Sequence, residues 1–164
     1  MARDSELGTH PAHRVSRVAL VGSSGGHLAH LLALHPFWAR HDRFWVTFDT
    51  PDAVSQLAGE RTYWCHHPTN RNLKNLLRNT WLAFRILRSE RPDLIVSSGA
   101  AVAVPFFWLG RLFGARTAFV EVIDRIDSAS LTGRLVRRPA TIVLLQWEEQ
   151  VRFYPGGRVV GPIL

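Results

Sequence analysis

Short apolar runs alternate with longer segments of helical period from residue 17 onward, and this alternation limits the fold more than any other feature of the chain. β-Branched and aromatic residues dominate the short runs, as is usual for strands. Strands that alternate with helices form a parallel sheet, because each crossover between parallel neighbours needs a long connection. The sequence therefore predicts an α/β domain with a Rossmann-like parallel sheet and helices on both of its faces. The seven expected strands are residues 18–21, 44–48, 62–65, 94–97, 117–120, 142–145 and 158–160.

The chain has 164 residues, which is enough for one domain with a single core. We assign residues 17–164 to that domain. Residues 1–16 mix charges with proline and lack the apolar centre of a signal peptide, so we expect a disordered lead-in. Pro51 suits a first helical turn, and Gly59 and Gly114 occupy places where helices often end. The four expected helices are residues 27–39, 51–58, 72–90 and 102–113.

The chain is basic, with 20 Lys and Arg against 13 Asp and Glu and a formal net charge of +7. This excess favours a polyanion, a phosphorylated ligand or an acidic membrane surface as a partner, although genome base composition also produces arginine-rich chains. The chain has no helix-turn-helix, zinc finger or RNP-like aromatic strand, so we expect no nucleic-acid partner. The longest apolar stretch, residues 100–109, is about half of the roughly 20 residues that a membrane-spanning helix needs. Cys65 is the sole cysteine, which excludes an intrachain disulfide.

A loop of three glycines and two serines follows the first strand and leads into a helix. Such a loop brings backbone amides close to a ligand, and the helix dipole favours a phosphate or another anion there. The glycines do not match the dinucleotide-binding fingerprint and no P-loop lysine follows, so a plain tight turn is the alternative. His27 opens the helix, and its imidazole suits proton transfer near neutral pH, a ligand contact or a simple cap position. The candidate binding residues of this loop are Gly22, Ser23, Ser24, Gly25 and Gly26.

Two further loops follow the strands at 94–97 and 117–120. The first repeats the small-residue pattern, so the two small-residue loops are expected to face each other across one cleft; close packing of a helix on its strand is the alternative. The second contains three acids around an arginine, which suit sugar hydroxyls or proton transfer, and a solvated, self-neutralising loop is the alternative. No metal is expected, because these acids lack the surrounding ligands of a metal site. The candidates are Ser98, Gly99, Asp124, Arg125 and Asp127 for binding and Glu121 for catalysis.

The segment 72–90 predicts an amphipathic helix whose core face carries Leu73, Leu76, Leu77, Trp81, Phe84 and Leu87. Cations lie beside this face, and two apolar residues project from the opposite side among them. Apolar residues among cations are typical of a helix at an anionic membrane interface, whereas a solvated face with two incidental apolar residues is the alternative. The expected membrane contacts are Lys74, Arg78, Leu82, Arg85 and Ile86.

Four segments, taken in order, resemble one known family. They are GSSGGH at 22–27, SSGAAVAVP at 97–105, EVIDRIDSASLTGRL at 121–135 and QWEEQVRFYP at 146–155. The family comprises the membrane-associated subunit of the two-subunit UDP-GlcNAc transferase of the dolichol pathway and its bacterial polysaccharide-biosynthesis relatives. It is similar to the N-terminal half of GT-B glycosyltransferases, in which this half holds the acceptor and the C-terminal half holds most of the nucleotide-sugar.

The resemblance implies a subunit of an inverting glycosyltransferase that is inactive alone and acts on a polyprenyl-diphosphate-linked sugar. The glycine loop would meet the lipid diphosphate, His27 would assist deprotonation of the acceptor hydroxyl, and the acids from Glu121 to Asp127 would contact the acceptor sugar. No cofactor is expected to bind tightly, and the UDP-sugar donor is expected mainly on a partner subunit. Eukaryotic members carry an N-terminal membrane helix that residues 1–17 do not supply, so we expect a peripheral protein on the cytoplasmic face of the plasma membrane. A non-catalytic scaffold that recruits a self-sufficient partner enzyme to the membrane is the alternative.

Overall fold

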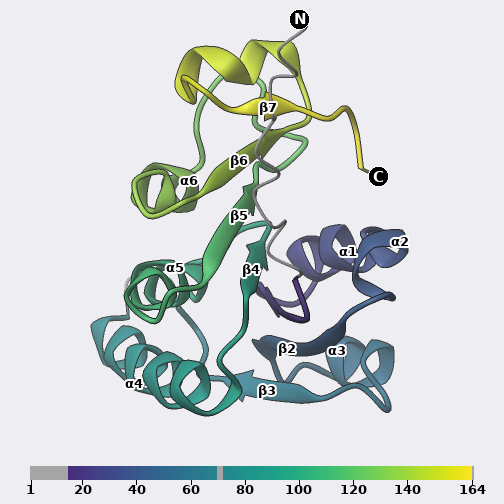
Figure 1. The fold of residues 1–164 in the computed structure, drawn as a ribbon, viewed down its shortest axis with the longest axis vertical. Helices are drawn as coiled ribbons and strands as arrows, with labels where there is room; N and C mark the ends of the chain where they lie inside the picture. The colour runs from purple at the N-terminus through teal and green to yellow at the C-terminus, as the bar shows by residue number, and fades with distance from the viewer. Residues whose placement is uncertain (1–14, 70–71, 164) are drawn as a thin grey trace, which may run out of the picture.

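A single seven-stranded parallel sheet forms the centre of the protein, in the order β3-β2-β1-β4-β5-β6-β7 (Figure 1). The computed structural model describes residues 15–69 and 72–163, so the expected lead-in lies outside the described residues except for its last two positions. All seven predicted strands are confirmed, with bounds that differ by at most two residues. The strands are β1 (Arg17–Val21), β2 (Asp42–Phe48), β3 (Thr62–Cys65), β4 (Leu94–Ser97), β5 (Arg116–Val120), β6 (Ile142–Leu145) and β7 (Arg158–Val159).

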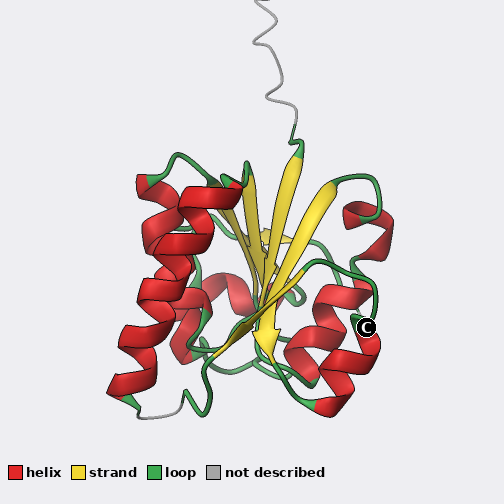
Figure 2. Cartoon of the chain, turned by 90° about the horizontal axis from the view of Figure 1, so that it is seen from below, coloured by secondary structure: helices red, strands yellow, loops and turns green. Residues whose placement is uncertain are grey.

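Helices cover both faces of the sheet, as the sequence predicts (Figure 2). From β1 the chain moves outward to β2 and β3, and it then returns to the other side of β1 and continues through β4 to β7. Right-handed crossovers in these two opposite directions place α1, α2 and α3 on one face and α4, α5 and α6 on the other. The helices are α1 (Gly26–Ala33), α2 (His35–Trp38), α3 (Pro51–Gln56), α4 (Leu73–Glu90), α5 (Ala103–Leu112) and α6 (Leu131–Val136), with a 3₁₀ segment η1 (Glu148–Phe153).

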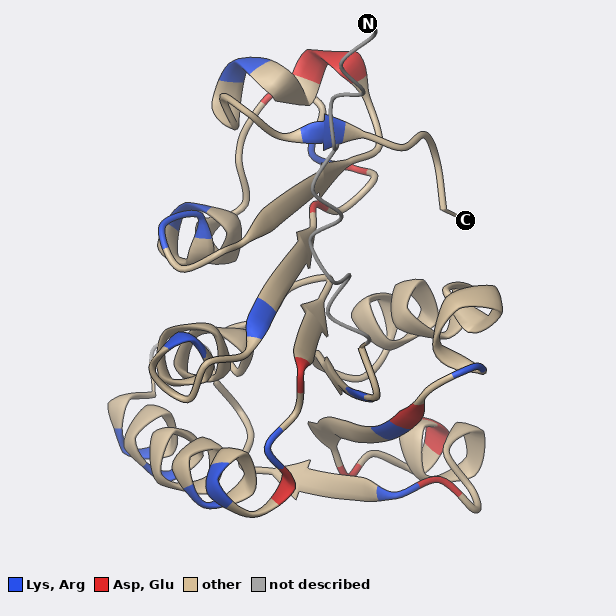
Figure 3. Ribbon diagram, viewed as in Figure 1, with Lys and Arg blue, Asp and Glu red and all other residues tan. Residues whose placement is uncertain are grey.

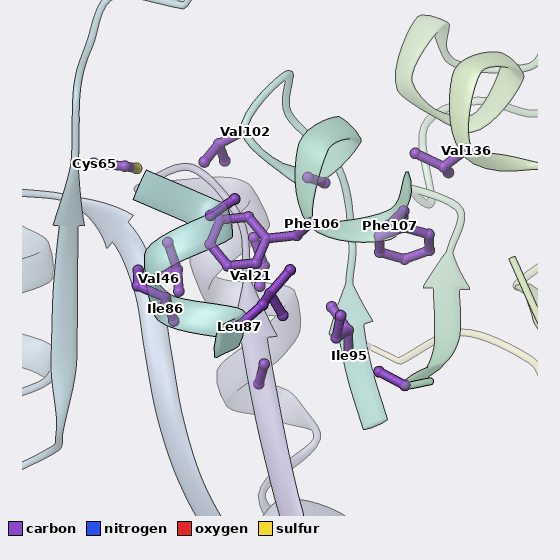
Figure 4. Packing of buried hydrophobic residues seen from close by; sticks show 14 of the residues in the cluster. Val21, Val46, Cys65, Ile86, Leu87, Ile95, Val102, Phe106, Phe107 and Val136 are labelled. Atoms are coloured by element: carbon purple, nitrogen blue, oxygen red, sulfur yellow. The ribbon is translucent and has the colours of Figure 1, made fainter. Parts of the chain in front are cut away.

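Two apolar clusters, one on each face of the sheet, hold these layers together. The larger cluster joins the sheet to α4 and α5, and Figure 4 shows Val21, Ile95 and Phe106 packed together within it. Neighbouring strand residues point to the opposite face, where Leu20 and Trp45 pack beneath the α1–α3 layer. Burying a large apolar side chain contributes about 1.5–3 kcal/mol, so both faces of the sheet stabilise the fold.

The predicted orientation of α4 is wrong. Its buried side contains Asn75, Asn79, Ala83, Ile86 and Leu87, whereas most of the predicted core face is exposed. Hydrogen bonds of two asparagines cause this orientation. The Asn79 side chain accepts from the His66 amide and donates to the His66 carbonyl, and Asn75 donates to the Pro68 carbonyl at 2.9 Å. A prediction from the spacing of apolar residues does not take these hydrogen bonds into account, although they keep the asparagines on the buried side of α4.

The observed orientation of α4 differs from the predicted one and changes which residues are available as membrane contacts. Ile86 is 3% exposed and belongs to the core, and Leu82 is half-buried against the same cluster, so neither projects toward solvent as expected. Lys74, Arg78 and Arg85 are exposed, as predicted. Within the described residues, no helix combines the length and the hydropathy that crossing a membrane requires.

Candidate functional site

The candidate site lies at the carboxyl ends of β1, β4, β5 and β6, where four loops meet. β1 and β4 are neighbours in the sheet, with Val21 beside Ser97, although the chain leaves them in opposite directions. Ligands of open α/β sheets collect outside the carboxyl ends of the strands at such a switch point. The fold therefore brings the predicted glycine loop and the loop after β4 to one place.

The glycine loop opens directly onto the N-terminus of α1. Gly25 adopts a φ of 74°, a conformation that side chains rarely adopt, and both Gly25 and Gly26 are exposed. Exposed backbone amides at the start of a helix favour a negatively charged group, so the geometry of this loop is compatible with its predicted affinity for anions.

His27 fills the space between the glycine loop and the loop after β4. A Cβ atom added to Gly99, whose φ is 138°, would lie 2.4 Å from Cε1 of the His27 ring. The Ser98 hydroxyl donates to the His27 carbonyl at 2.9 Å, and the Ser97 hydroxyl accepts from the Gly99 amide at 3.0 Å. The two small-residue loops thus face each other as predicted, and Gly99 is required because the imidazole occupies the place of a side chain.

The His27 ring is suited to accept a proton. Burial lowers the pKa of His27, although the Ser98 backbone and the charges of Asp124 and Glu121 act in the opposite direction. Its Nδ1 atom is buried and has no hydrogen-bond partner. A neutral imidazole is the form that a general base requires.

Glu121 is the first residue of the acidic loop, residues 121–130, and it is buried, although a catalytic carboxylate was expected there. Its side chain is fully buried, and its oxygens accept hydrogen bonds from the Val122 amide, the Ser130 amide and hydroxyl, and the Tyr154 hydroxyl. Burial and the bond to Glu121 raise the pKa of Tyr154, which keeps that phenol protonated as a donor. With both oxygens occupied, the carboxylate anchors the loop at both ends.

Residues 146–154 hold the rest of the acidic loop. Gln146 donates to the Glu121 carbonyl at 2.8 Å, and Gln150 donates to the carbonyls of Val122 and Arg125. The Trp147 indole donates to the Ile123 carbonyl at 2.8 Å. These contacts fix the backbone of the loop while Asp124, Arg125 and Asp127 remain exposed, and Asp127 also pairs with Arg152 at 3.1 Å.

Sequence reasoning did not assign Gln146, Gln150 or Tyr154 to the site. The signal for the two glutamines was the presence of two amide side chains within five residues of the end of a buried strand, because such groups can satisfy the backbone of a neighbouring loop. Within the described residues, no three or more His, Cys, Asp and Glu side chains are grouped to hold a metal ion.

A surface that we call the apolar–cationic face covers the outer side of α4, α5 and α6. The Trp81 and Phe84 rings stack at 5.5 Å, Phe84 contacts Phe113 at 5.7 Å, and Trp108 donates to the Leu135 carbonyl at 3.2 Å, so the three helices share one surface. Its large exposed apolar residues are Leu73, Leu76, Leu77, Trp81, Trp108, Leu112, Phe113, Leu131 and Leu135.

Cations accompany this face, whereas the three helices of the opposite layer contain none. Figure 3 shows Lys and Arg along α4 and on α6. The cations of the face are Lys74, Arg78, Arg85 and Arg88 of α4, Arg111 of α5 and Arg134 of α6. The asymmetry gives the molecule one side suited to an anionic apolar surface.

Comparisons with known proteins indicate the family of the chain and agree with its fold. A family model described as "Oligosaccharide biosynthesis protein Alg14 like" matches residues 57–163. The chain is 24% identical to the UDP-N-acetylglucosamine transferase subunit ALG14 of Rattus norvegicus. The alignment is 176 residues long and covers 88% of this chain and 82% of that relative. It is 26% identical to the Homo sapiens subunit of the same name over 94 residues, which cover 54% of this chain and 44% of that relative.

Two solved structures show the same architecture. MurG of Acinetobacter baumannii superposes with a TM-score of 0.71 and 19% identity, over 89% of this chain and 45% of that one. UDP-N-acetylglucosamine 2-epimerase of Rickettsia bellii superposes with a TM-score of 0.72 and 10% identity, over 92% of this chain and 46% of that one. These likenesses show the fold, and the chain spans less than half the length of either structure.

Proposed function

Because the chain belongs to the family of Alg14-like oligosaccharide biosynthesis proteins, whose relatives are glycosyltransferase subunits, we propose that it is the acceptor-binding subunit of an inverting glycosyltransferase. The acceptor is a polyprenyl-diphosphate-linked sugar. A separate subunit binds the UDP-sugar donor, in keeping with the word "subunit" in the name of the rat and human relatives.

The observation that carries this proposal is that an exposed glycine loop at a helix N-terminus lies beside the His27 imidazole, whose pKa is lowered by burial. The exposed glycine loop at the start of α1 supplies amides and a helix dipole for a diphosphate. His27 lies directly beside it, held in place by Gly99. A site that binds a diphosphate and accepts one proton meets the needs of an acceptor whose hydroxyl is to be activated.

The chemistry needs one base and one electrostatic clamp. His27 takes the proton of the acceptor hydroxyl as its oxygen attacks the anomeric carbon of the donor. The exposed side chains of Asp124, Arg125 and Asp127 contact the acceptor sugar, and the anchored backbone beneath them keeps their positions fixed. The clamp on the departing nucleoside diphosphate comes mainly from the donor-binding subunit.

The apolar–cationic face brings the protein to its lipid-linked acceptor. Trp81 is 63% exposed and Leu112 is 82% exposed, and such large apolar side chains among arginines suit an anionic bilayer surface. The protein is then peripheral on the cytoplasmic face of the plasma membrane. The face lies on α4–α6 and so replaces the contacts expected at Leu82 and Ile86.

The face also supports a second candidate function, a scaffold that only recruits a self-sufficient enzyme to the membrane. Acceptor binding separates the two functions, because only the acceptor-binding subunit needs to bind the lipid-linked sugar.

Calorimetric titration of the unchanged chain with a short-chain polyprenyl diphosphate sugar should show binding, and the same lipid with a monophosphate should bind more weakly. His27→Ala should retain this binding and abolish transfer when the donor-binding subunit is added, whereas the matched control His66→Ala should preserve both. A chain that does not bind the acceptor would contradict the acceptor-binding proposal and favour the scaffold.

A further inference from the structure

A pocket that contains three arginines lies between α6 and η1, outside the candidate site described above. Its volume is about 370 Å³, which is within the range of small-ligand pockets. Two of the arginines belong to the end of α6 and the third to η1, and Figure 3 shows cations on both elements. The residues that line this arginine pocket are Ala129, Arg134, Arg137, Arg152, Phe153 and Tyr154.

Close packing between α6 and the end of η1 fixes the shape of the arginine pocket. A Cβ atom added to Gly133 of α6 would overlap the Tyr154 hydroxyl, so a larger residue would push the two elements apart. That hydroxyl donates to the buried Glu121 carboxylate, and the Gly133 amide donates to the Ser130 hydroxyl at 3.0 Å. The backbone on both sides of the pocket is therefore held in place before a ligand binds, which lowers the cost of binding.

The positive charge of the pocket is only partly balanced. Arg152 pairs with Asp127 at 3.1 Å, but the Asp127 side chain is 94% exposed, so water weakens this pair. Within the described residues, neither Arg134 nor Arg137 forms an ion pair. These two residues are three apart at the end of α6, where like charges repel each other. An anion in the pocket relieves this repulsion and accepts hydrogen bonds from the guanidinium groups.

The surroundings of the pocket favour a phosphate that is held at a membrane. Arg134 belongs both to the pocket and to the apolar–cationic face, and the neighbouring Leu131 and Leu135 are 73% and 47% exposed. A soluble anion leaves these leucines in water, whereas the phosphate of a lipid headgroup arrives together with apolar chains that can cover them. Arginine suits this ligand, because its planar guanidinium donates two parallel hydrogen bonds to phosphate oxygens.

We propose that the arginine pocket binds the phosphate headgroup of an anionic membrane lipid and prefers a terminal phosphate, that is, a phosphomonoester. A phosphomonoester offers three acceptor oxygens and close to two negative charges to the three guanidinium groups, whereas a phosphodiester offers two free oxygens and one charge. The inference goes beyond acceptor binding, and it rests on the membrane contact that the proposed function assigns to the apolar–cationic face. The bound headgroup fixes how α6 meets the bilayer and so orients the edge of the sheet that holds His27.

The first test uses soluble phosphates and needs no membrane. NMR titration of the arginine side-chain N–H groups with glycerol 3-phosphate should shift the signals of Arg134, Arg137 and Arg152, and the phosphodiester dimethyl phosphate should bind more weakly. Arg137→Gln should weaken binding about tenfold or more, since a hydrogen bond to a charged group is lost. Arg85 and Arg88 are exposed arginines with the same spacing on α4 and should not respond. An equal response of these two would show unspecific attraction and overturn the proposal.

The second test uses vesicles of matched surface charge that contain either phosphatidic acid, a phosphomonoester, or phosphatidylglycerol, a phosphodiester. The unchanged chain should sediment with the phosphatidic acid vesicles at an about tenfold lower lipid concentration. Arg134→Gln with Arg137→Gln should remove this preference. Arg85→Gln with Arg88→Gln, the matched control, should weaken binding to both kinds of vesicle and keep the preference. Thermal unfolding of each variant verifies that it is folded.

The outcomes separate this proposal from the membrane contact on which it rests. Binding to both kinds of vesicle without a preference would overturn the headgroup site and leave the membrane contact standing. Binding to neither would overturn the membrane contact and the lipid ligand together. A chain that binds glycerol 3-phosphate but prefers neither vesicle would have a site for a soluble phosphate, which also overturns the proposal.

Discussion

The pairing of Gly99 with His27 shows how one backbone position shapes the site. Gly99→Ala should shift the His27 ring and reduce the stability of the fold, because the new Cβ would meet the ring and would also adopt an unfavourable φ. Gly114→Ala is the matched control, since Gly114 has a φ of 83° but no neighbour within 4 Å of an added Cβ. Urea unfolding should show a loss of about 1–2 kcal/mol for the control and a larger loss for Gly99→Ala. Equal losses would mean that His27 does not need this space.

Two histidines of α1 also make the stability of the fold sensitive to acid. Burial lowers the pKa values of His27 and His30 below the value of about 6.5 that unfolded histidine has. The unfolded chain then binds more protons, so the free energy of unfolding should fall as pH decreases from about 6.5 through the lowered pKa values. Urea midpoints measured between pH 8 and pH 5 check this, and His30→Gln should flatten the decrease. A midpoint that rises on acidification in this range would contradict it.

The buried Glu121 carboxylate joins the two ends of the acidic loop, residues 121–130, through its bonds to Val122 and Ser130. Glu121→Gln replaces an acceptor oxygen with an amide donor that faces other donors, so we expect a loss of about 1–3 kcal/mol in unfolding free energy. Amide hydrogen exchange should also become faster between Val122 and Ser130. Glu148→Gln, at an exposed position of η1, should change neither quantity. Unchanged exchange in Glu121→Gln would show that the loop does not depend on this carboxylate.

The sequence predicted the strands better than the orientation of the helices. Short apolar runs such as Val18 to Val21 are local signals, and they are clear here because strands of a parallel sheet are buried on both faces and so are apolar along their whole length. The outward face of α4 depends on tertiary hydrogen bonds of Asn75 and Asn79 that apolar periodicity does not contain. The segment 27–39 was predicted as one helix but forms α1 and α2, and Pro36 lies in the first turn of the second. The short α6 and η1 were not predicted.

The candidate site also contains some residues that the local sequence predicts and others whose role depends on tertiary contacts. The glycine loop, His27 and the Ser98–Gly99 wall were predicted because residue type and position after a strand define them. The burial of Glu121 was not, because its donors include Tyr154, which lies 33 residues along the chain.

At the scale of the whole molecule, the proposed function assigns the membrane contact to one side of the protein and the chemistry to one edge of its sheet. The double change Leu77→Ser and Trp81→Ser should weaken sedimentation with vesicles that contain anionic lipid, because it removes two exposed apolar side chains of the apolar–cationic face. Val54→Ser, at an exposed position of α3 in the opposite layer, is the matched control. Equal vesicle binding by the double variant and the unchanged chain would place the membrane contact elsewhere.

The cations of the same face should contribute separately. Lys74→Gln with Arg78→Gln should reduce binding to anionic vesicles roughly 30-fold, since each cation near such a surface contributes about 1 kcal/mol. Binding to neutral vesicles should change little, and high salt should remove the difference between the variant and the unchanged chain. A salt-independent loss would indicate damage to the fold instead of lost attraction.

Sugar transfer in membranes tests the central claim most directly. Labelled sugar from a panel of UDP-sugars is offered to polyprenyl-diphosphate-linked acceptors with this chain alone, the donor-binding subunit alone, and both together. The account predicts transfer only with both, and its loss when the chain carries His27→Ala. Full transfer by the donor-binding subunit alone would contradict the account and leave this chain as a membrane scaffold.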